Sequence, residues 1–310
     1  MAVPLRLASS RFFFPKPLHI FSFSFSFSTS SPSPPPIRVS LTDSVGRAVF
    51  ATRPIPSGYL IHTAQPAVCH PSPSALHPVC YSCLSTLSQR SPFCSHHCHQ
   101  RSKEYYDVEM KANWEDFDDY CRNRGLKYPF LVKRLACMII SGVAKSDSLD
   151  ILQPATLTPE MIFEMEEGFT LLRNAFTKTL VSDEQIAFLT KQWYISVLAR
   201  IRINAFRIEL ASGSYEDLLS SAFASVEAET AVGNAVYILP SFYNHDCDPN
   251  AHIIWIDSAE AKLKALRDID EGEEMRICYI DASLNRDARR ELLFRGFGFQ
   301  CNCSRCLHGD

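Results

Sequence analysis

The sequence predicts an α+β fold in which short strands near both ends of the chain enclose a helical middle. Runs rich in β-branched and aromatic residues, separated by Pro, Gly and Asp, fall within residues 37–68 and 235–280. Between about residue 103 and residue 212, apolar side chains recur instead every three or four residues, the period of an amphipathic helix. With 310 residues, 46% of them hydrophobic, the chain is long enough to bury a sizeable core.

The first 38 residues differ in composition from the rest and are left out of the predicted fold. They are basic and rich in serine, they contain the low-complexity run FSFSFSFS, and no acidic residue precedes Asp43. This bias is typical of an organellar transit peptide, and a disordered tail is the alternative. The run SPSPPPIR then reads as a linker, because consecutive prolines stiffen the backbone and block helix and sheet.

Three short strands open the predicted fold. IRVSLTD at 37–43 and GRAVFAT at 46–52 read as the first two, the second with good alternation of apolar and polar side chains. RPIPSG follows as a turn, because Pro fixes one backbone angle and Gly permits a left-handed conformation. GYLIHTAQPAV at 58–68 then reads as the third strand.

Start signals for two helices lie in the middle of the chain. Thr158 reads as an N-cap followed by Pro159 at the first helical position. Ser182 and Gln185 fit a capping box that opens a second helix. Each helix has an apolar stripe that we interpret as core: Met165, Phe169, Leu172 and Phe176 in the first, and Ile186, Leu189, Trp193, Val197 and Ile201 in the second.

Strands return after the helices, at 235–239, 251–257, 261–268 and 274–280. The run NRDARRELLFRGFGF then starts as a basic helix and is expected to break at Gly296. No strand is followed by G-x-G-x-x-G or by a Walker-type loop, so an ordinary nucleotide-binding βαβ unit is unsupported.

The spacing of the first cysteines predicts a zinc site. Cys80 and Cys83 form C-x2-C, and Cys94 and Cys98 form C-x3-C after ten intervening residues. Two such pairs on tight turns can converge on one tetrahedral zinc, with zinc–sulfur bonds of about 2.3 Å. Disulfides or unpaired buried thiols are the alternatives. A neighbouring histidine could also replace one sulfur: His96, His97 or His99.

A second metal cluster is predicted at the other end of the chain. Cys301, Cys303 and Cys306 supply three thiolates as C-x-C-x2-C, whereas a closed structural zinc site takes four ligands. Cys247, in the turn SFYNHDCDPNAH at 241–252, is the obvious fourth. Zinc would then pin the tail against this turn, leaving the adjacent Asn-His pair for a ligand. The alternative is a C-terminal cluster that binds metal alone, with Cys247 merely buried.

Charge and hydropathy exclude some partners. The net charge is −3 and the pI about 6.4, so the dense basic face that nucleic-acid backbones require is not expected. No stretch approaches the roughly 20 apolar residues of a membrane helix. We therefore predict no direct binding to nucleic acid or membrane. We also expect a monomer.

Three motifs together resemble the SET-domain lysine methyltransferases. SFYNHDCDPN at 241–250 resembles N-H-x-C-x-P-N, GEEMRICYID at 272–281 resembles G-E-E-x-x-x-x-Y, and CNCSRC at 301–306 resembles the post-SET zinc cluster. Their order and spacing match as well. VGRAVFATRPIPSG at 45–58 matches the start of the SET domain, although Ala48 stands where a second Gly is common.

The early cysteines and the helical middle make the chain similar to the MYND-SET proteins and, among plant proteins, to the trithorax-related SET group. The resemblance implies a SET fold of small β-sheets with a knot-like C-terminal segment over 39–285, and a post-SET zinc cluster at 286–310. It also implies a MYND-like zinc finger insert at 69–105 and a helical insert at 106–212. The finger is truncated, since the ligand pairs for a second zinc are missing, so the peptide binding of a full finger does not carry over.

The resemblance also implies a cofactor. The family binds S-adenosylmethionine and passes its methyl group to a lysine amine inserted through a narrow channel. Asn244 and His245 match positions that hold the adenine and methionine ends of the cofactor. Phe297 and Phe299 match aromatic positions that flank the adenine and the channel. Further cofactor contacts are implied at Gly46, Arg47, Asn204 and Ser241.

Tyr279 matches the catalytic tyrosine, whose phenol lies near the methyl donor and orients the amine for an in-line displacement. The predicted function is therefore an S-adenosylmethionine-dependent protein-lysine N-methyltransferase with two structural zinc ions. The alternative is a non-catalytic SET and zinc-finger adaptor for chromatin or other proteins. A zinc hydrolase would need an open metal position, and sites with four sulfurs leave none.

The substrate and the compartment stay open at this point. The trithorax-related resemblance implies the nucleus and the histone H3 tail, at its fourth-position lysine. The N-terminal composition favours a plastid or mitochondrion, where the substrate would be a non-histone protein. The number of methyl groups added depends on channel width, which the sequence does not give.

Overall fold

The computed structural model describes residues 34–309 apart from 44–45, 74, 76–77, 89–90, 178, 180 and 212–230. Most of the predicted transit peptide and the end of the predicted helical insert therefore lie outside the described residues. The elements below all belong to one compact unit, Pro35–Asp310.

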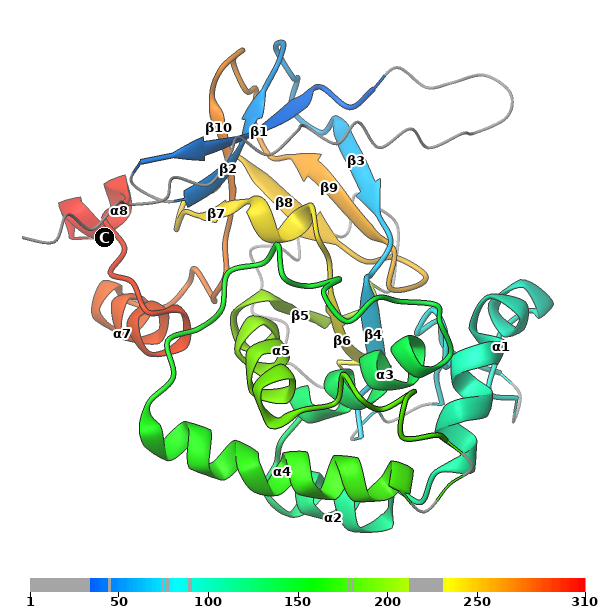
Figure 1. The fold of residues 1–310 in the computed structure, drawn as a ribbon. Helices are drawn as coiled ribbons and strands as arrows, with labels where there is room; N and C mark the ends of the chain where they lie inside the picture. Colours follow the sequence, from blue (N-terminus) through cyan, green and yellow to red (C-terminus); the bar gives the residue numbers. More distant parts are fainter. Residues whose placement is uncertain are drawn as a thin grey trace, which may run out of the picture. The chain divides into compact units, whose positions relative to one another are not determined.

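The first sheet joins strands from both ends of this unit. Its order is β1 (Ile37–Thr42), β2 (Gly46–Ala51), β10 (Glu274–Ile277) and β7 (Asn244–His245) (Figure 1). β10 pairs antiparallel with β2 and parallel with β7, placing Arg276 opposite Asn244 and Ile277 opposite His245. Two motifs that lie apart in the sequence are therefore neighbours in one sheet.

Two further antiparallel sheets complete the strands. One has the order β3 (Leu60–Ala64), β9 (Ala261–Ala265), β8 (Ala251–Ile254), and the other the order β4 (Val68–Pro71), β6 (Gly233–Val236), β5 (Ala205–Ile208). Inward-facing side chains of β9 alternate with half-buried ones, as expected for a sheet with one covered face. The small sheets and the intervening helices confirm the predicted α+β class.

Among the described residues, five helices lie between the early strands and the late ones: α1 (His96–Lys111), α2 (Glu115–Asn123), α3 (Tyr128–Ile140), α4 (Pro159–Thr177) and α5 (Lys191–Asn204). Figure 1 shows α2 to α5 gathered below the sheets, with α1 on one side and α7 (Arg286–Phe297) and α8 (Ser304–His308) on the other. α4 begins at Pro159 as predicted, and the Thr158 hydroxyl accepts the Met161 N–H at 3.3 Å. Among the described helices, none is both long and apolar enough to cross a bilayer.

Two predicted helix boundaries are wrong. The Ser182–Gln185 capping box forms in both directions, at 3.0 and 3.3 Å, but the residues after it make turns and no helix. Thr190 explains the delay, because it is extended and its hydroxyl caps the Trp193 N–H at 3.1 Å, so that α5 can begin only beyond it. The helical middle also ends early, since β5 follows directly after α5.

The C-terminal helix passes through the predicted break. α7 includes Gly296 and ends instead at Phe297, followed by its C-cap Gly298, which has a φ of 80°. Glycine adopts this left-handed conformation without steric cost, and the Gly298 N–H donates to the carbonyl of Phe294 at 3.0 Å. The chain then turns directly toward the last three cysteines.

A buried ionic network joins α1 to α3. Arg134 is 2% exposed and donates to the Glu109 carboxylate at 2.8 Å, with its guanidinium 3.5 Å from the centre of the Tyr81 ring. The Tyr81 hydroxyl donates to the same carboxylate at 2.6 Å. Burial alone would raise the pKa of Glu109, but the charge of Arg134 lowers it to about 2. This network fixes α1, which follows the first cysteine cluster, to the core.

Candidate active site

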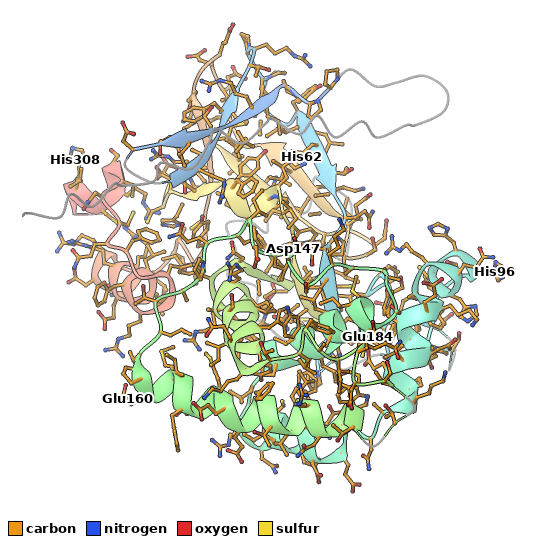
Figure 2. The ribbon with its side chains drawn as sticks, viewed as in Figure 1. His62, His96, Asp147, Glu160, Glu184 and His308 are labelled. Carbon is orange, nitrogen blue, oxygen red and sulfur yellow. The ribbon has the colours of Figure 1, made fainter. Side chains whose placement is uncertain are left out.

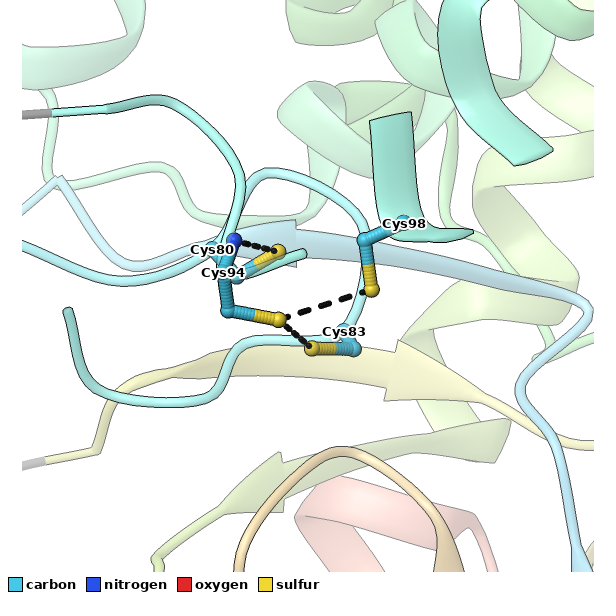
Figure 3. A group of neighbouring side chains, drawn as sticks. All are labelled: Cys80, Cys83, Cys94 and Cys98. Atoms are coloured by element: carbon cyan, nitrogen blue, oxygen red, sulfur yellow. Dashed lines mark hydrogen bonds between the residues drawn. The ribbon is translucent and has the colours of Figure 1, made fainter. Parts of the chain in front are cut away.

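The first four cysteines converge as predicted. Cys80 and Cys83 lie on turns after β4, Cys94 lies just before α1, and Cys98 lies in its first turn (Figure 3). The sulfur of Cys94 is 3.5 Å from that of Cys83 and 3.6 Å from that of Cys98. Four sulfurs around one tetrahedral zinc stand about 3.8 Å apart, so the arrangement fits the metal. Hydrogen bonds from Cys83 and the Cys94 amide lower the pKa of Cys80 to about 4, which favours a thiolate ligand.

The second set of cysteines also converges, and Cys247 is its fourth member. The Cys247 sulfur lies 3.9 Å from that of Cys301 and 3.6 Å from that of Cys306, and the four sulfur atoms all lie within 4.8 Å of one another. All four side chains are buried, Cys303 included. These spacings again fit a tetrahedral zinc. The structure therefore favours the four-sulfur interpretation over a C-terminal cluster without Cys247.

Two arginines stabilise this second cluster. Arg289 is 1% exposed and directs a guanidinium N–H toward the Cys306 sulfur at 3.9 Å. Burial alone would lower its pKa, but its hydrogen bonds to Cys306 and Cys247 raise it. Arg305 donates to the carbonyl of Cys247 at 3.0 Å and to that of Ala282 at 3.1 Å. A zinc ion with four thiolates carries net negative charge, and a buried guanidinium compensates it.

Tyr279 lies beside this cluster, just beyond the end of β10. Its hydroxyl donates to the carbonyl of Tyr243 at 2.6 Å, and its backbone N–H donates to Nδ1 of His245 at 3.1 Å. The Phe297 ring lies 4.9 Å from the Tyr279 ring, measured between centroids. Burial raises the pKa of the phenol well above its usual value, so the hydroxyl stays protonated. Tyr279 is thus a fixed donor whose lone pairs remain available to an amine.

His245 is buried between Tyr279 and the sulfur cluster. Its Nε2 lies 3.3 Å from the Cys247 sulfur, and its ring lies 6.0 Å from that of Phe299. Burial lowers the pKa of His245 to about 4, so the ring is neutral at neutral pH. Tyr279, Phe297 and Phe299 all pack against the same cysteines.

Asn244 links the turn of the first hairpin to the acidic motif. Its side-chain amide donates to the carbonyl of Arg47 at 3.2 Å and to the Glu274 carboxylate at 2.8 Å. Gly46 precedes Arg47 and has a φ of 74°, a conformation that favours glycine. The side chain of Asn244 therefore connects β7 to the start of β2, where Gly46 and Arg47 lie.

The last two predicted cofactor residues differ in placement. Ser241 lies one turn before Asn244 in the 3-10 helix η1 (Pro240–Phe242), and its hydroxyl donates to the carbonyl of Tyr237 at 2.6 Å. Asn204 ends α5 and is 8% exposed. Its amide donates to the carbonyls of Gln153 and Arg200 at 2.9 and 2.7 Å. These bonds tie Asn204 to the helical insert, and the contacts of its described side chain do not join it to Tyr279 or His245.

Sequence reasoning missed several residues that hold the site. The Tyr243 hydroxyl is 3.0 Å from Nε2 of His62, which lies on β3 and is labelled in Figure 2. Asn250 donates to Glu273 and to the carbonyl of Glu274, and it accepts the N–H of Arg276 at 2.8 Å. Asn250, the last residue of the N-H-x-C-x-P-N motif, is thereby bonded to β10, the strand of the G-E-E-x-x-x-x-Y motif. Asn250 carried a signal as the last letter of its motif, whereas His62 carried none.

A surface hollow of about 310 Å³ lies elsewhere, lined by Arg124 and by Phe163, Glu164, Glu166, Glu167 and Thr170 of α4. None of the predicted site residues lines it. Three of its charged side chains are engaged in ion pairs, between Arg124 and Glu167 at 2.8 Å and between Glu166 and Lys191 at 3.0 Å. We assign it no part in the site.

Comparison with known families decides the identity of the fold. The SET domain family matches residues 46–280, which is more than half of the chain. The chain belongs to the SET-domain family. This confirms the resemblance read from the motifs, and it places the match over β2 through Tyr279.

Relatives of this SET protein are similar over different lengths. The chain is 61% identical over 282 residues to the histone-lysine N-methyltransferase ATXR4 of Arabidopsis thaliana, covering 88% of this chain and 87% of the relative. It is 25% identical over 274 residues to a SET and MYND domain-containing protein of Dictyostelium discoideum, covering 80% and 77% of the two chains. Among solved structures, the SET domain of LSMT bound to lysine and AdoHcy overlaps with a TM-score of 0.39 and 13% identity, over 87% of this chain and 54% of that one.

Proposed function

We propose that this SET protein is an S-adenosylmethionine-dependent protein-lysine N-methyltransferase. The observation that carries the proposal is the placement of Tyr279, held at its phenol by Tyr243 and at its backbone by His245. The relative that is 61% identical along most of both chains bears the name of a histone-lysine N-methyltransferase. S-adenosylmethionine supplies a methyl group activated on a sulfonium.

Tyr279 would orient the amine and not remove its proton. Its own proton is committed to the Tyr243 carbonyl, and burial keeps the phenol neutral. The oxygen can still accept a hydrogen bond from a lysine amine. This bond would point the lone pair of the amine nitrogen along the line of transfer. Such alignment is the main contribution that a protein can make to an in-line displacement.

Aromatic rings around Tyr279 would help the substrate lysine to lose its proton. Phe297 and Phe299 stand beside Tyr279 and His245, in a region that packs against buried cysteines. A lysine amine has a pKa of about 10.4 in water, and removal from water favours its neutral form. Only the neutral amine has a free lone pair. On this proposal, the rings lower the pKa of the bound lysine.

Both cysteine clusters are proposed to hold zinc. Cys80, Cys83, Cys94 and Cys98 would bind one ion in a truncated MYND-like finger, and Cys247, Cys301, Cys303 and Cys306 would bind the other in a post-SET cluster. With four sulfurs each, the two sites would be structural. The similarity to a SET and MYND domain-containing protein supports the assignment of the finger.

A protein lysine is the proposed substrate. The name of the Arabidopsis relative supports a histone, and the fourth-position lysine of the H3 tail is the specific proposal that follows from the trithorax-related resemblance. The basic, serine-rich first 38 residues support a plastid or mitochondrial location and a non-histone substrate. Fusing residues 1–40 to a fluorescent protein separates the two: accumulation in an organelle supports the second, and a diffuse signal contradicts it.

Transfer of labelled methyl tests the proposed function. The full chain is incubated with labelled S-adenosylmethionine and, in parallel, with histones, nuclear extract and organelle extract. Tyr279→Phe should retain folding and zinc but lose at least about tenfold in kcat, because the group that orients the amine is gone. Tyr59→Phe is the matched control, since Tyr59 is 39% exposed and lies outside the cluster.

The same experiment judges the adaptor alternative. Label on a protein lysine that falls with Tyr279→Phe but not with Tyr59→Phe supports the enzyme. Equal labelling by all three proteins contradicts the role of Tyr279. No label in any mixture, from a folded protein that contains zinc, would favour the non-catalytic adaptor.

A further inference from the structure

The imidazole of His245 connects two parts of the site. Its Nδ1 is 3.1 Å from the backbone nitrogen of Tyr279, and its Nε2 is 3.3 Å from the Cys247 sulfur. A backbone amide can only donate, so Nδ1 must be the unprotonated nitrogen. The remaining proton is therefore on Nε2 and points at the sulfur. This tautomer follows from the partners and needs no other assumption.

The position of Cys247 depends on the C-terminal segment. Its sulfur lies among those of Cys301 and Cys306, which come 54 and 59 residues later in the chain. Arg305, from the same segment, donates to the carbonyls of Cys247 and Ala282. The C-terminal segment thus holds the chain on both sides of the Tyr279 hydrogen bond.

The hydrogen bond from the Tyr279 N–H to His245 forms just beyond the end of the pairing between β7 and β10. β7 and β10 pair in parallel only as far as His245 and Ile277. Two residues further on, the Tyr279 N–H finds its acceptor in the His245 side chain, where the strand offers no further partner in β7. The phenol of the same residue is anchored on Tyr243. A displaced imidazole would therefore release the backbone of Tyr279 while its phenol stays attached, and so tilt the ring.

We propose that His245 is a positioning residue whose imidazole transmits the closed state of the Cys247, Cys301, Cys303 and Cys306 cluster to the backbone of Tyr279. The phenol of Tyr279 is then correctly placed only while the four sulfurs are held together. The proposal deepens the proposed methyltransferase function and rests on it for its effect on rate. The link itself can be tested without any reaction.

The first test follows the backbone amide of Tyr279 by nuclear magnetic resonance. The full chain is labelled with 15N-tyrosine, which gives eleven tyrosine signals, and the Tyr279 signal is the one absent from Tyr279→Phe. Zinc is removed in steps with a chelator and then returned. The Tyr279 signal should shift when the second cluster loses zinc and recover when zinc is restored. Tyr81 lies next to Cys80, so its signal reports the first cluster separately.

Two conservative variants test separately the two contacts of the His245 ring, the one with the Tyr279 N–H and the one with the Cys247 sulfur. In His245→Asn, the side-chain oxygen can occupy the place of Nδ1, but nothing reaches the sulfur. In His245→Gln, a nitrogen can occupy the place of Nε2, but the acceptor for Tyr279 is lost. The Tyr279 signal should be displaced in His245→Gln even with both clusters closed. In His245→Asn it should stay near its native position but no longer follow zinc removal.

Kinetics give the second readout. His245→Gln should lose about tenfold in kcat, the effect of one hydrogen bond, and His245→Asn should lose less, while KM for S-adenosylmethionine changes less than about twofold in both. Zinc content should stay at two ions per chain in this proposal. A Tyr279 signal that ignores zinc removal in the unchanged protein would overturn the link. So would a wild-type kcat in His245→Gln. A link seen by resonance in a protein that transfers no methyl would refute the proposed function alone.

Discussion

The two cysteine clusters offer the same ligands but are built differently. The first closes within residues 80–98, whereas the second joins Cys247 to residues 54 and 59 positions later. Cys94 of the first is exposed, and all four cysteines of the second are buried. In Figure 1 the helix that follows the first, α1, and the helices that surround the second, α7 and α8, lie on opposite sides of the sheets.

Their neighbours differ as well, and this predicts different roles. Tyr81, beside the first cluster, leads to the buried Arg134 and Glu109 in the helical core. Cys247, in the second, leads through His245 to Tyr279. A local cluster that contacts the helical core should matter for stability. A cluster that joins distant segments beside Tyr279 should matter for activity.

The largest expected effect concerns the stability side of this comparison. Arg134→Met should lower the free energy of unfolding by about 3–5 kcal/mol, because Glu109 would be left buried without its main partner. Urea unfolding of the full chain measures it. Arg124→Met is the matched control, since its ion pair with Glu167 is about half exposed and should contribute at most about 1 kcal/mol. Equal losses in the two variants would show that the buried network does not stabilise the fold.

Next in size is the activity side. Cys301→Ser should lower kcat/KM about 100-fold, or about 2.7 kcal/mol, because an opened cluster no longer fixes the backbone near Tyr279 and small misplacements are costly. The methyl-transfer assay measures the loss, and metal analysis should find one zinc fewer per chain. Activity within about threefold of the unchanged protein would break the comparison, since the second cluster would then be no more important to the reaction than a surface site.

The motifs predicted which segments become neighbours more accurately than the local capping signals predicted where helices begin. N-H-x-C-x-P-N and G-E-E-x-x-x-x-Y did become neighbours, because β7 and β10 pair and Asn250 bonds to the strand of the second motif. The first four cysteines converged, since their spacing is a local property that the sequence displays, and Cys247 joined the C-terminal three as its motif turn had indicated. Metal binding and the cofactor contacts stay predictions.

What the sequence could not show depends on long-range contacts. His62 and Tyr243 meet across 181 residues, and no spacing rule connects them. Arg134 looks like an ordinary surface arginine until α3 is seen to be buried on nearly every side. The Ser182 capping box formed without a helix because Thr190 supplied a second cap eight residues later, and local signals do not rank two competing starts.

The contribution of the buried Glu109 to the free energy of unfolding should also depend on pH. The pKa of Glu109 is lowered to about 2 in the folded chain from an ordinary 4.5, so its contribution is complete above pH 4.5 and is lost as the pH falls toward 2. Between pH 5 and pH 3 the unchanged protein should lose about 2 kcal/mol more stability than Glu109→Gln. Urea unfolding at both pH values measures the difference. Parallel losses in the two proteins would mean that the Glu109 carboxylate is not held ionised by Arg134.

The smallest effect is expected at Cys94, the one exposed member of the first cluster. Cys94→Ser should weaken zinc binding at that cluster, yet kcat/KM should fall less than about threefold, or 0.7 kcal/mol. The first cluster contacts the core through Tyr81 and α1. The ion pair between Arg134 of α3 and Glu109 of α1 can hold these two helices together without the metal. The assay used for Cys301→Ser, run side by side, measures it. A loss as large as that of Cys301→Ser would mean that the first cluster touches the substrate or the site directly, and the two clusters would then share one role.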